Sequence, residues 1–178
     1  MSNLPEIEQI RAIQSTLQDE KIRDYKRRVS FGDLLTDRWE NARQYGFEEG
    51  SSIYDNALVI GNVKVGRQTW IGPNTVLDGS GGLEIGEYCQ IGPGVQIFTH
   101  NHIRWSLTRG KEGPERKPTK IGNGVFIAAN SVIMAGITIG DDVVIGALSF
   151  VNKDVPTGTI VAGTPARQIG LSASLLDD

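Results

Sequence analysis

Residues 121–151 read IGNGVF-IAANSV-IMAGIT-IGDDVV-IGALSF-V, with an aliphatic side chain at every sixth position. We call this spacing the hexad ladder. Neither the two-residue period of an ordinary strand nor the 3.6-residue period of a helix accounts for it. The members of the ladder are Ile53, Val59, Val65, Ile71 and Leu77, then Ile85, Ile91, Ile97 and Ile103, then Ile121, Ile127, Ile133, Ile139, Ile145 and Val151.

A six-residue period predicts one short strand and one tight turn in each unit. Three units make one triangular coil, and stacked coils place equivalent residues on top of one another in a parallel β-helix. The fifth residue of a unit is usually small, as at Thr75, Cys89 and Ser149, so we expect it to face inward beside the aliphatic residue. Cys89 is therefore expected to be a buried packing residue. The sequence predicts an all-β fold of this kind.

The hexad ladder is interrupted twice. The step from Leu77 to Ile85 is eight residues, which predicts a bulge of two residues within 78–82. The pattern is then lost in residues 104–120, which predict a loop that leaves the coil and returns in phase. This loop is basic and contains Gly and Pro, so it is either solvated or reaches over a cleft to hold an anionic or sugar acceptor.

The N-terminal 50 residues predict helices. Residues 1–28 are expected to form an amphipathic helix, and a second helix is expected from Ser30 to Gly46, with Asp33 completing a capping box. Terminal repeats need a cover, so we expect both helices to shield the open first coil. A direct role in an acceptor pocket is the alternative. The apolar positions that define the helices are Ile7, Ile10, Ile13 and Leu17, then Phe31, Leu34, Leu35, Trp39 and Ala42.

Composition narrows the functional classes. The chain has 178 residues, a formal net charge of −3 and one cysteine, so no basic excess favours nucleic acid and no internal disulfide is possible. No apolar run approaches the roughly 18 residues of a membrane span, and the N-terminus lacks the apolar core of a secretory signal. We expect a cytoplasmic protein with a helical region at 1–50, a β-helix domain at 51–170 and a tail at 171–178.

Both histidines of the chain lie in the stretch IFTHNHI, residues 97–103. A neutral imidazole is the usual proton acceptor near pH 7, so His100 and His102 beside a loop mouth predict an active site. Asn101 between them falls at a small inward position of the ladder. Arg104 and Trp105 open the loop that follows, and the indole could stack on a sugar face.

Several motifs together resemble the left-handed β-helix acyltransferases. They are the hexads, His100-Asn101-His102, Ile121-Gly122-Asn123, Asn152-Lys153-Asp154-Val155-Pro156 and Ala162-Gly163-Thr164-Pro165-Ala166-Arg167. The resemblance covers residues 53–170 and is greatest to the maltose and galactoside type of sugar O-acetyltransferases and to polysaccharide-biosynthesis O-acetyltransferases. It implies a left-handed coil and a homotrimer with acetyl-CoA sites in clefts between subunits.

The resemblance also implies roles for single residues. It aligns the catalytic histidine of the family with His102 and leaves His100 as a supporting contact or a structural loop residue. An acceptor-binding Asn of galactoside-type members falls at Gly72, so Asn74 two positions away is the candidate. The residues implied for CoA are Lys153 and Arg167 at the 3′-phosphate, Asn152 where the family often has Thr, and Ala129 and Ala147 along the pantetheine channel.

These observations predict acetyl transfer from acetyl-CoA to a sugar or polysaccharide-precursor hydroxyl, with a histidine base and no metal. The chain has no Gly-x-Ser-x-Gly elbow, so direct attack is favoured over a covalent acyl-enzyme. An N-acyltransferase acting on an amino or nucleotide sugar is the alternative, followed by a non-catalytic scaffold. A γ-class carbonic anhydrase would need three histidine ligands, and serine O-acetyltransferase is disfavoured because its long helical N-terminal domain is absent.

Overall fold

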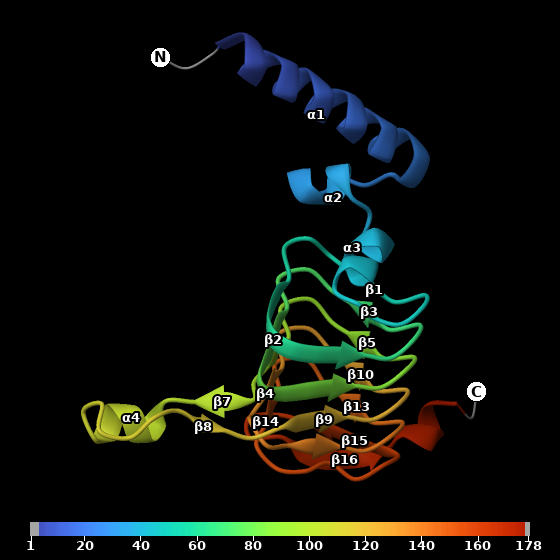
Figure 1. Ribbon diagram of the computed structural model, residues 1–178. Helices are drawn as coiled ribbons and strands as arrows, with labels where there is room; N and C mark the ends of the chain where they lie inside the picture. Colours follow the sequence, from blue (N-terminus) through green and yellow to red (C-terminus); the bar gives the residue numbers. More distant parts are fainter. Residues whose placement is uncertain (1–3, 177–178) are drawn as a thin grey trace.

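Short parallel strands stacked in three faces form the body of the protein (Figure 1). The computed structural model describes residues 4–176. The first face holds β1 (Ser52–Ile53), β3 (Trp70–Ile71), β5 (Gln90–Ile91), β10 (Phe126–Ile127), β13 (Val144–Ile145) and β15 (Thr159–Ala162). The second holds β6 (Gln96–Ile97), β11 (Val132–Ile133) and β14 (Phe150–Val151), and the third holds β9 (Thr119–Ile121) and β12 (Thr138–Ile139). Two long strands, β2 (Leu58–Val65) and β4 (Val76–Ile85), run through both the second and third faces.

The hexad ladder forms the core, as the spacing predicts. Ile71 pairs with Ile91, Ile91 with Ile127, and Ile127 with Ile145, and all four side chains are fully buried. The small fifth positions are buried as well, and Cys89 among them has no exposed surface. Stacked aliphatic side chains fill the prism at every level, which removes apolar surface from water along its whole length.

The predicted two-residue bulge is also found, inside β4. Gly61 pairs with Gly79 and Val63 with Leu83, so one residue of β2 lies opposite three of β4. The insertion therefore leaves the strand continuous but makes its path irregular at the edge between the second and third faces.

The projecting loop interrupts the hexad ladder earlier than the sequence indicates. Ile103 was expected to be inward, yet it is 54% exposed and begins the short helix α4 (Ile103–Leu107). Asn101 was expected in an inward slot, but it lies in β7 (His100–Asn101), which pairs antiparallel with β8 (Glu115–Arg116). The chain leaves the coil at Thr99 because this pairing draws residues 100–116 outward into a projecting arm (Figure 1).

The N-terminal helices cover the first coil only in part. The predicted second helix is instead two helices, α2 (Phe31–Leu35) and α3 (Arg38–Gln44). The break occurs because the Asp37 side chain caps the N-terminus of α3, where it accepts hydrogen bonds from the amides of Trp39 and Glu40. Of these, α3 packs on β1 and buries Ala42 against the core, and Gly46 at φ +72° follows its end.

The first helix, α1 (Leu4–Tyr25), is not a cover. It lies beyond α2 from the β-helix (Figure 1), and Ile7, Ile10 and Ile13 are 40–53% exposed. Phe31, Leu35 and Trp39 are exposed as well, so the predicted apolar stripes do not all face a core. Residues 1–3 of the expected first helix lie outside the described part.

The C-terminus closes the other end. Strand β16 (Arg167–Leu171) turns back antiparallel to β15, and Ser172–Leu175 of the expected tail form a 3₁₀ turn. Between residues 4 and 176, no helix is both long enough and apolar enough to cross a membrane.

The inward stacking predicts a local stability test. Truncating Ile139, which is 1% exposed, to Ala should lower the free energy of unfolding by about 2–5 kcal/mol, because it leaves a cavity between two coils. The outward neighbour Thr138 is exposed, and Thr138→Ala should change it by less than about 0.5 kcal/mol. Urea denaturation of both variants measures the difference, and equal losses would contradict the inward assignment.

Candidate active site

The edge between the second and third faces carries both histidines. We call it the arm edge; it comprises residues 78–82, residues 98–118 with the arm at 100–116, and residues 134–137 and 152–154. Polar groups can gather here because the ladder residues on either side fill the interior and leave the turns at the surface. The other edge considered below, between the first and second faces, carries residues 72–75, 128–131 and 146–149, and we call it the plain edge.

The centre of the arm edge is a contact between a histidine and a buried carboxylate. Nδ1 of His100 lies 2.6 Å from Oδ2 of Asp78, whose side chain is only 1% exposed, while the His100 side chain is 26% exposed. A carboxylate on Nδ1 fixes the orientation of the ring and favours the tautomer with a free Nε2. His100 is thus an imidazole held in one orientation with its second nitrogen available as a proton acceptor.

Asp78 is itself fixed by a network of donors. The amide of Thr99 donates to Oδ2 at 2.8 Å, and the amide of Ser80 donates to Oδ1 at 3.0 Å. Burial alone would raise the pKa of Asp78, but the hydrogen bonds from Ser80, Thr99 and His100 hold this pKa well below its ordinary value. Asp78 is therefore ionised at neutral pH and presents a fixed negative charge to His100.

Sequence reasoning missed Asp78 as a site residue. The available signal was an acidic side chain directly after the ladder residue Leu77, at the start of the irregular insertion. Its partner is 22 residues away, so only the stacking of coils brings the two together.

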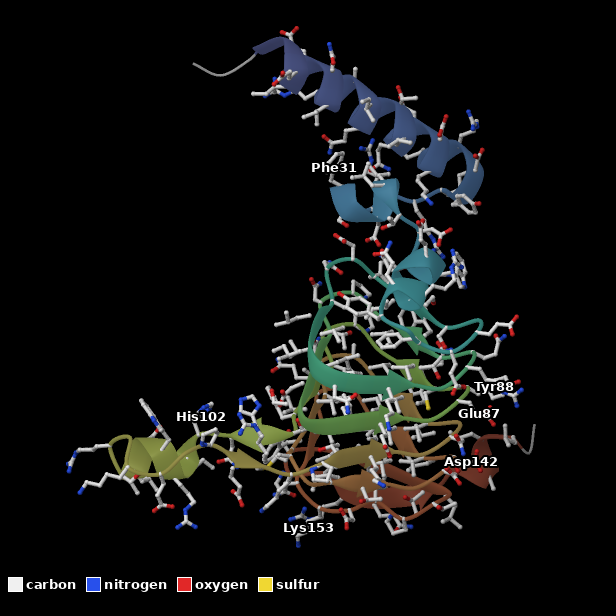
Figure 2. The ribbon with its side chains drawn as sticks, in the orientation of Figure 1. Phe31, Glu87, Tyr88, His102, Asp142 and Lys153 are labelled. Carbon is white, nitrogen blue, oxygen red and sulfur yellow. The ribbon has the colours of Figure 1, made fainter. Side chains whose placement is uncertain are left out.

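The second histidine lies at the base of the arm and is exposed (Figure 2). The His102 ring stands edge-on to that of His100, with 5.2 Å between centroids, and edge-on to Trp105 at 6.4 Å. Trp105 is half exposed, so an imidazole and an indole face solvent together at the arm base. This arrangement offers a surface on which a sugar ring could rest.

Arg104 is less available than the sequence suggests. Its Nε lies 2.5 Å from a carboxylate oxygen of Glu112 within the arm, and this pair raises the pKa of the guanidinium through the Glu112 hydrogen bond. The arm is further held by Asn101, whose Nδ2 donates to Glu115 at 3.1 Å.

Three of the predicted CoA residues share one hollow. Asn152, Lys153 and Arg167 line a pocket of about 170 Å³ together with Ala166 and Gln168. Lys153 lies on the arm edge, below the arm as drawn in Figure 2. Two cationic side chains in one hollow suit a phosphate group.

The remaining predicted residues lie elsewhere in the chain. Ala129 and Ala147 are on the plain edge, separated from the histidines by the second face. Asn74 is also on the plain edge at φ +58°, where its Oδ1 accepts from Nδ2 of Asn56 at 3.0 Å. Within one chain, the structure thus joins the histidines to neither the two alanines nor Asn74.

Cys89 takes no part in the site. Its Sγ donates to the carbonyl of Gly122 at 3.1 Å, and burial raises the pKa of its thiol. Between residues 4 and 176, no cluster of three or more His, Cys, Asp or Glu side chains could hold a metal ion.

The charged state of Asp78 predicts a pH effect on stability. The pKa of Asp78 in the folded protein lies below its unfolded value of about 3.9. The contribution of the ionised carboxylate to the free energy of unfolding is therefore present above about pH 3.9 and is lost as the pH falls through the folded pKa. Asp78→Asn should lower the free energy of unfolding by about 1–3 kcal/mol at pH 7. The variant should also lose less stability than the parent between pH 5 and pH 2.

Urea titrations from pH 2 to 7 measure this difference. Asp19→Asn on the exposed surface of α1 is the control and should follow the parent at every pH. Identical acid profiles for Asp78→Asn and the parent would refute the assigned charge.

Comparison with known proteins agrees with the β-helix fold. A family model described as bacterial transferase hexapeptide (six repeats) matches residues 118–153. The chain is 35% identical over 108 residues to galactoside O-acetyltransferase of Escherichia coli K12, which covers 61% of this chain and 53% of that protein. The chain thus spans about half the length of this curated relative, and about a quarter of several others.

Solved structures match over most of the chain. A hexapeptide-repeat acetyltransferase from Vibrio cholerae, solved with acetyl coenzyme A, superposes with a TM-score of 0.68 at 28% identity, covering 95% of this chain and 90% of that one. A maltose O-acetyltransferase from Clostridium difficile 630 superposes at 0.54 and 30% identity, covering 92% and 84%.

Both structural matches extend over more than nine-tenths of this chain, well beyond the residues of the family model. The predicted left-handed parallel β-helix with N-terminal helices and one extruded loop is thereby confirmed, and of these helices α3 packs on the first coil. The chain belongs to the hexapeptide-repeat acyltransferases.

Proposed function

We propose that this protein transfers an acetyl group from acetyl-CoA to a hydroxyl of a sugar or polysaccharide precursor. The observation that carries the proposal is the arm edge, where Asp78 orients the imidazole of His100. Lys153 of the same edge lines a pocket at the C-terminal end of the β-helix together with Arg167. The relatives named for galactoside and maltose acetylation, and the relative solved with acetyl coenzyme A, support both the acceptor class and the donor.

The reaction needs one proton acceptor. The imidazole takes the proton of the acceptor hydroxyl, and the hydroxyl oxygen attacks the thioester carbonyl carbon to form a tetrahedral intermediate. The intermediate collapses with cleavage of the carbon–sulfur bond, and the imidazolium returns its proton to the departing thiolate. The products are the acetyl ester and free CoA, and no covalent enzyme intermediate is required.

The contacts favour His100 as this base. Asp78 holds Nδ1 and leaves Nε2 free, which is the arrangement that an efficient base requires. His102, to which the family resemblance assigns the role, is exposed and makes no hydrogen bond to an orienting group in the described chain. We assign His102, together with Trp105 and Arg104, to positioning of the acceptor.

We assign the binding of the acetyl-CoA donor to residues of both the arm edge and the plain edge. Lys153 and Arg167 would hold the 3′-phosphate, and Asn152 lines the same pocket. Ala129 and Ala147 would line the pantetheine channel from the plain edge. Since one chain does not bring the two edges together, this assignment supports a homotrimer in which each cleft uses the arm edge of one subunit and the plain edge of the next. Asn74 would then reach the acceptor from the same plain edge.

An acceptor screen tests the activity directly. Purified protein with acetyl-CoA should release free thiol when galactosides, maltose or related saccharides are added, and mass spectrometry with mild base should show a labile ester. A base-stable amide formed on an amino sugar would instead establish the N-acyltransferase alternative. Absence of thiol release with every saccharide and amino sugar would refute the proposal.

We place the enzyme in the cytoplasm, where its donor acetyl-CoA is found.

The base assignment predicts a ranking of variants. His100→Gln should lower kcat by about 10²- to 10⁴-fold, because no group then accepts the proton, while leaving the affinity for CoA unchanged. Asp78→Asn should lower kcat by a smaller factor, since the ring persists without its orienting charge. His102→Gln should mainly raise KM for the acceptor. Steady-state kinetics at pH 7.5 rank the three, and a larger kcat loss for His102→Gln would move the base to His102.

The phosphate assignment predicts a selective binding defect. Lys153→Ala and Arg167→Ala should each raise KM for acetyl-CoA by about tenfold, yet leave KM for acetyl-3′-dephospho-CoA unchanged, because that donor lacks the contacted group. Lys64→Ala is the control: this lysine pairs with Glu84 on the third face and should affect neither donor. Equal defects with both donors would show that the two cations act elsewhere on CoA.

A further inference from the structure

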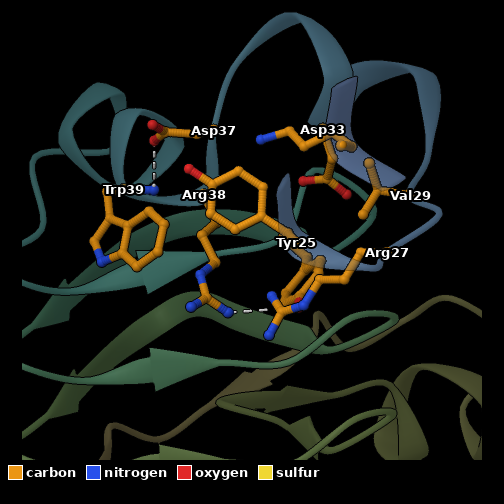
Figure 3. A pocket seen from close by; sticks show the side chains of 9 residues that line it. Tyr25, Arg27, Val29, Asp33, Asp37, Arg38 and Trp39 are labelled. Carbon is orange, nitrogen blue, oxygen red and sulfur yellow. Dashed lines mark hydrogen bonds between the residues drawn. The ribbon is translucent and has the colours of Figure 1, made fainter. Parts of the chain in front are cut away.

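A groove that the proposed reaction does not use lies where α1, α2 and α3 meet the β-helix. Its deeper part is a cavity of about 200 Å³ between the helices and Tyr54 (Figure 3). Its outer part continues onto the first face over Trp70, Gln68 and Gln90. The two parts share Arg38 and Tyr54, so they form one continuous surface, which we call the helix-junction groove.

The groove contains a cation without an anion. Nε of Arg38 is buried and has no hydrogen-bond partner, and its Nη1 reaches only the Tyr54 hydroxyl at 3.5 Å. Figure 3 shows the guanidinium groups of Arg27 and Arg38 on the same side of the pocket. Lys21 lines it too, and none of these three cations pairs with a carboxylate among residues 4–176.

The two acidic residues in the cavity do not fill this role. Asp33 accepts from the amide of Asp55 at 3.0 Å and from the Ser30 hydroxyl at 2.9 Å. Asp37 accepts from two amides at the start of α3. Both carboxylates therefore already accept hydrogen bonds from other donors, and a buried guanidinium nitrogen without an acceptor calls for an external anion.

The rest of the groove suits a carbohydrate. The guanidinium of Arg38 lies 4.2 Å from the ring of Trp39, and the rings of Tyr54 and Trp70 stand perpendicular at 6.2 Å. Aromatic faces pack against the C–H faces of sugars, and side-chain amides such as Gln68 and Gln90 can donate to and accept from hydroxyls. Aromatic rings, amides and an unpaired cation along one groove match an anionic sugar better than a purely apolar or purely ionic ligand.

We propose that the helix-junction groove binds an anionic saccharide, with its carboxylate or phosphate on Arg38 and Arg27 and its sugar rings along Trp39, Tyr54 and Trp70. The groove lies on the first face and the helices, away from the arm edge of the same chain. Binding there does not depend on acetyl transfer, so it can be measured even if the proposed reaction is wrong.

Calorimetric titration with trigalacturonate tests the proposal, with fully methyl-esterified trigalacturonate as the neutral match. The acid should bind, and more weakly as salt increases, whereas the ester should bind at least tenfold more weakly. Arg38→Gln and Arg27→Gln should each weaken binding of the acid by about tenfold or more. Arg43→Gln, on the same helix but outside the groove, should leave it unchanged.

Three outcomes would overturn the proposal. The first is no binding of trigalacturonate, and the second is equal binding of acid and ester. The third is displacement by inorganic phosphate with no loss in Trp39→Ala, which would indicate an anion site without sugar recognition. Thermal melting of Arg38→Gln checks that it folds, and ligand-observed NMR with Arg27→Gln provides the same comparison if it does not.

Discussion

The inward stacking of aliphatic side chains every six residues is the constraint on which the rest of this structure depends. The prism is so narrow that Ile71, Ile91, Ile127 and Ile145 fill it at successive levels with no exposed surface. Little room remains inside for a polar constellation, and the flat faces offer only short strands. The histidine site therefore lies at an edge, where residues can be inserted without disrupting the stack.

The part of the fold set by this repeat could be predicted from the sequence. The buried ladder and the small positions such as Cys89 follow from a local period that no neighbouring element has to supply. The predictions fail where the position of a residue depends on contacts outside its own repeat. Ile103 keeps the phase but leaves the coil, because residues 100–101 pair with 115–116 in the arm and Ile121 takes the next position on the third face. The exposed isoleucines of α1 have helical spacing, but spacing does not say what covers them.

Most residues of the candidate site could be predicted from the sequence, but the contacts between them could not. The histidines were identifiable because they are the only two, and Lys153 and Arg167 because their motifs resemble a family. Asp78 was not, since its contact with His100 depends on coil stacking combined with a two-residue insertion. That insertion, which looks like a flaw in the repeat, carries the carboxylate to the edge where the arm begins. In this chain, the departures from the period carry Asp78, His100 and His102.

The same reasoning explains why the polar features of this chain are dispersed. Each edge or end of the prism can carry one set of groups, and the stacked core keeps the sets apart: the histidines on the arm edge, the small residues on the plain edge, and the cations of the helix-junction groove at the N-terminal end. Because the prism is rigid, these groups of residues cannot approach one another within one chain. A site that needs two of them is most simply completed by packing a second prism alongside, so the geometry of one chain sets the geometry of its assembly.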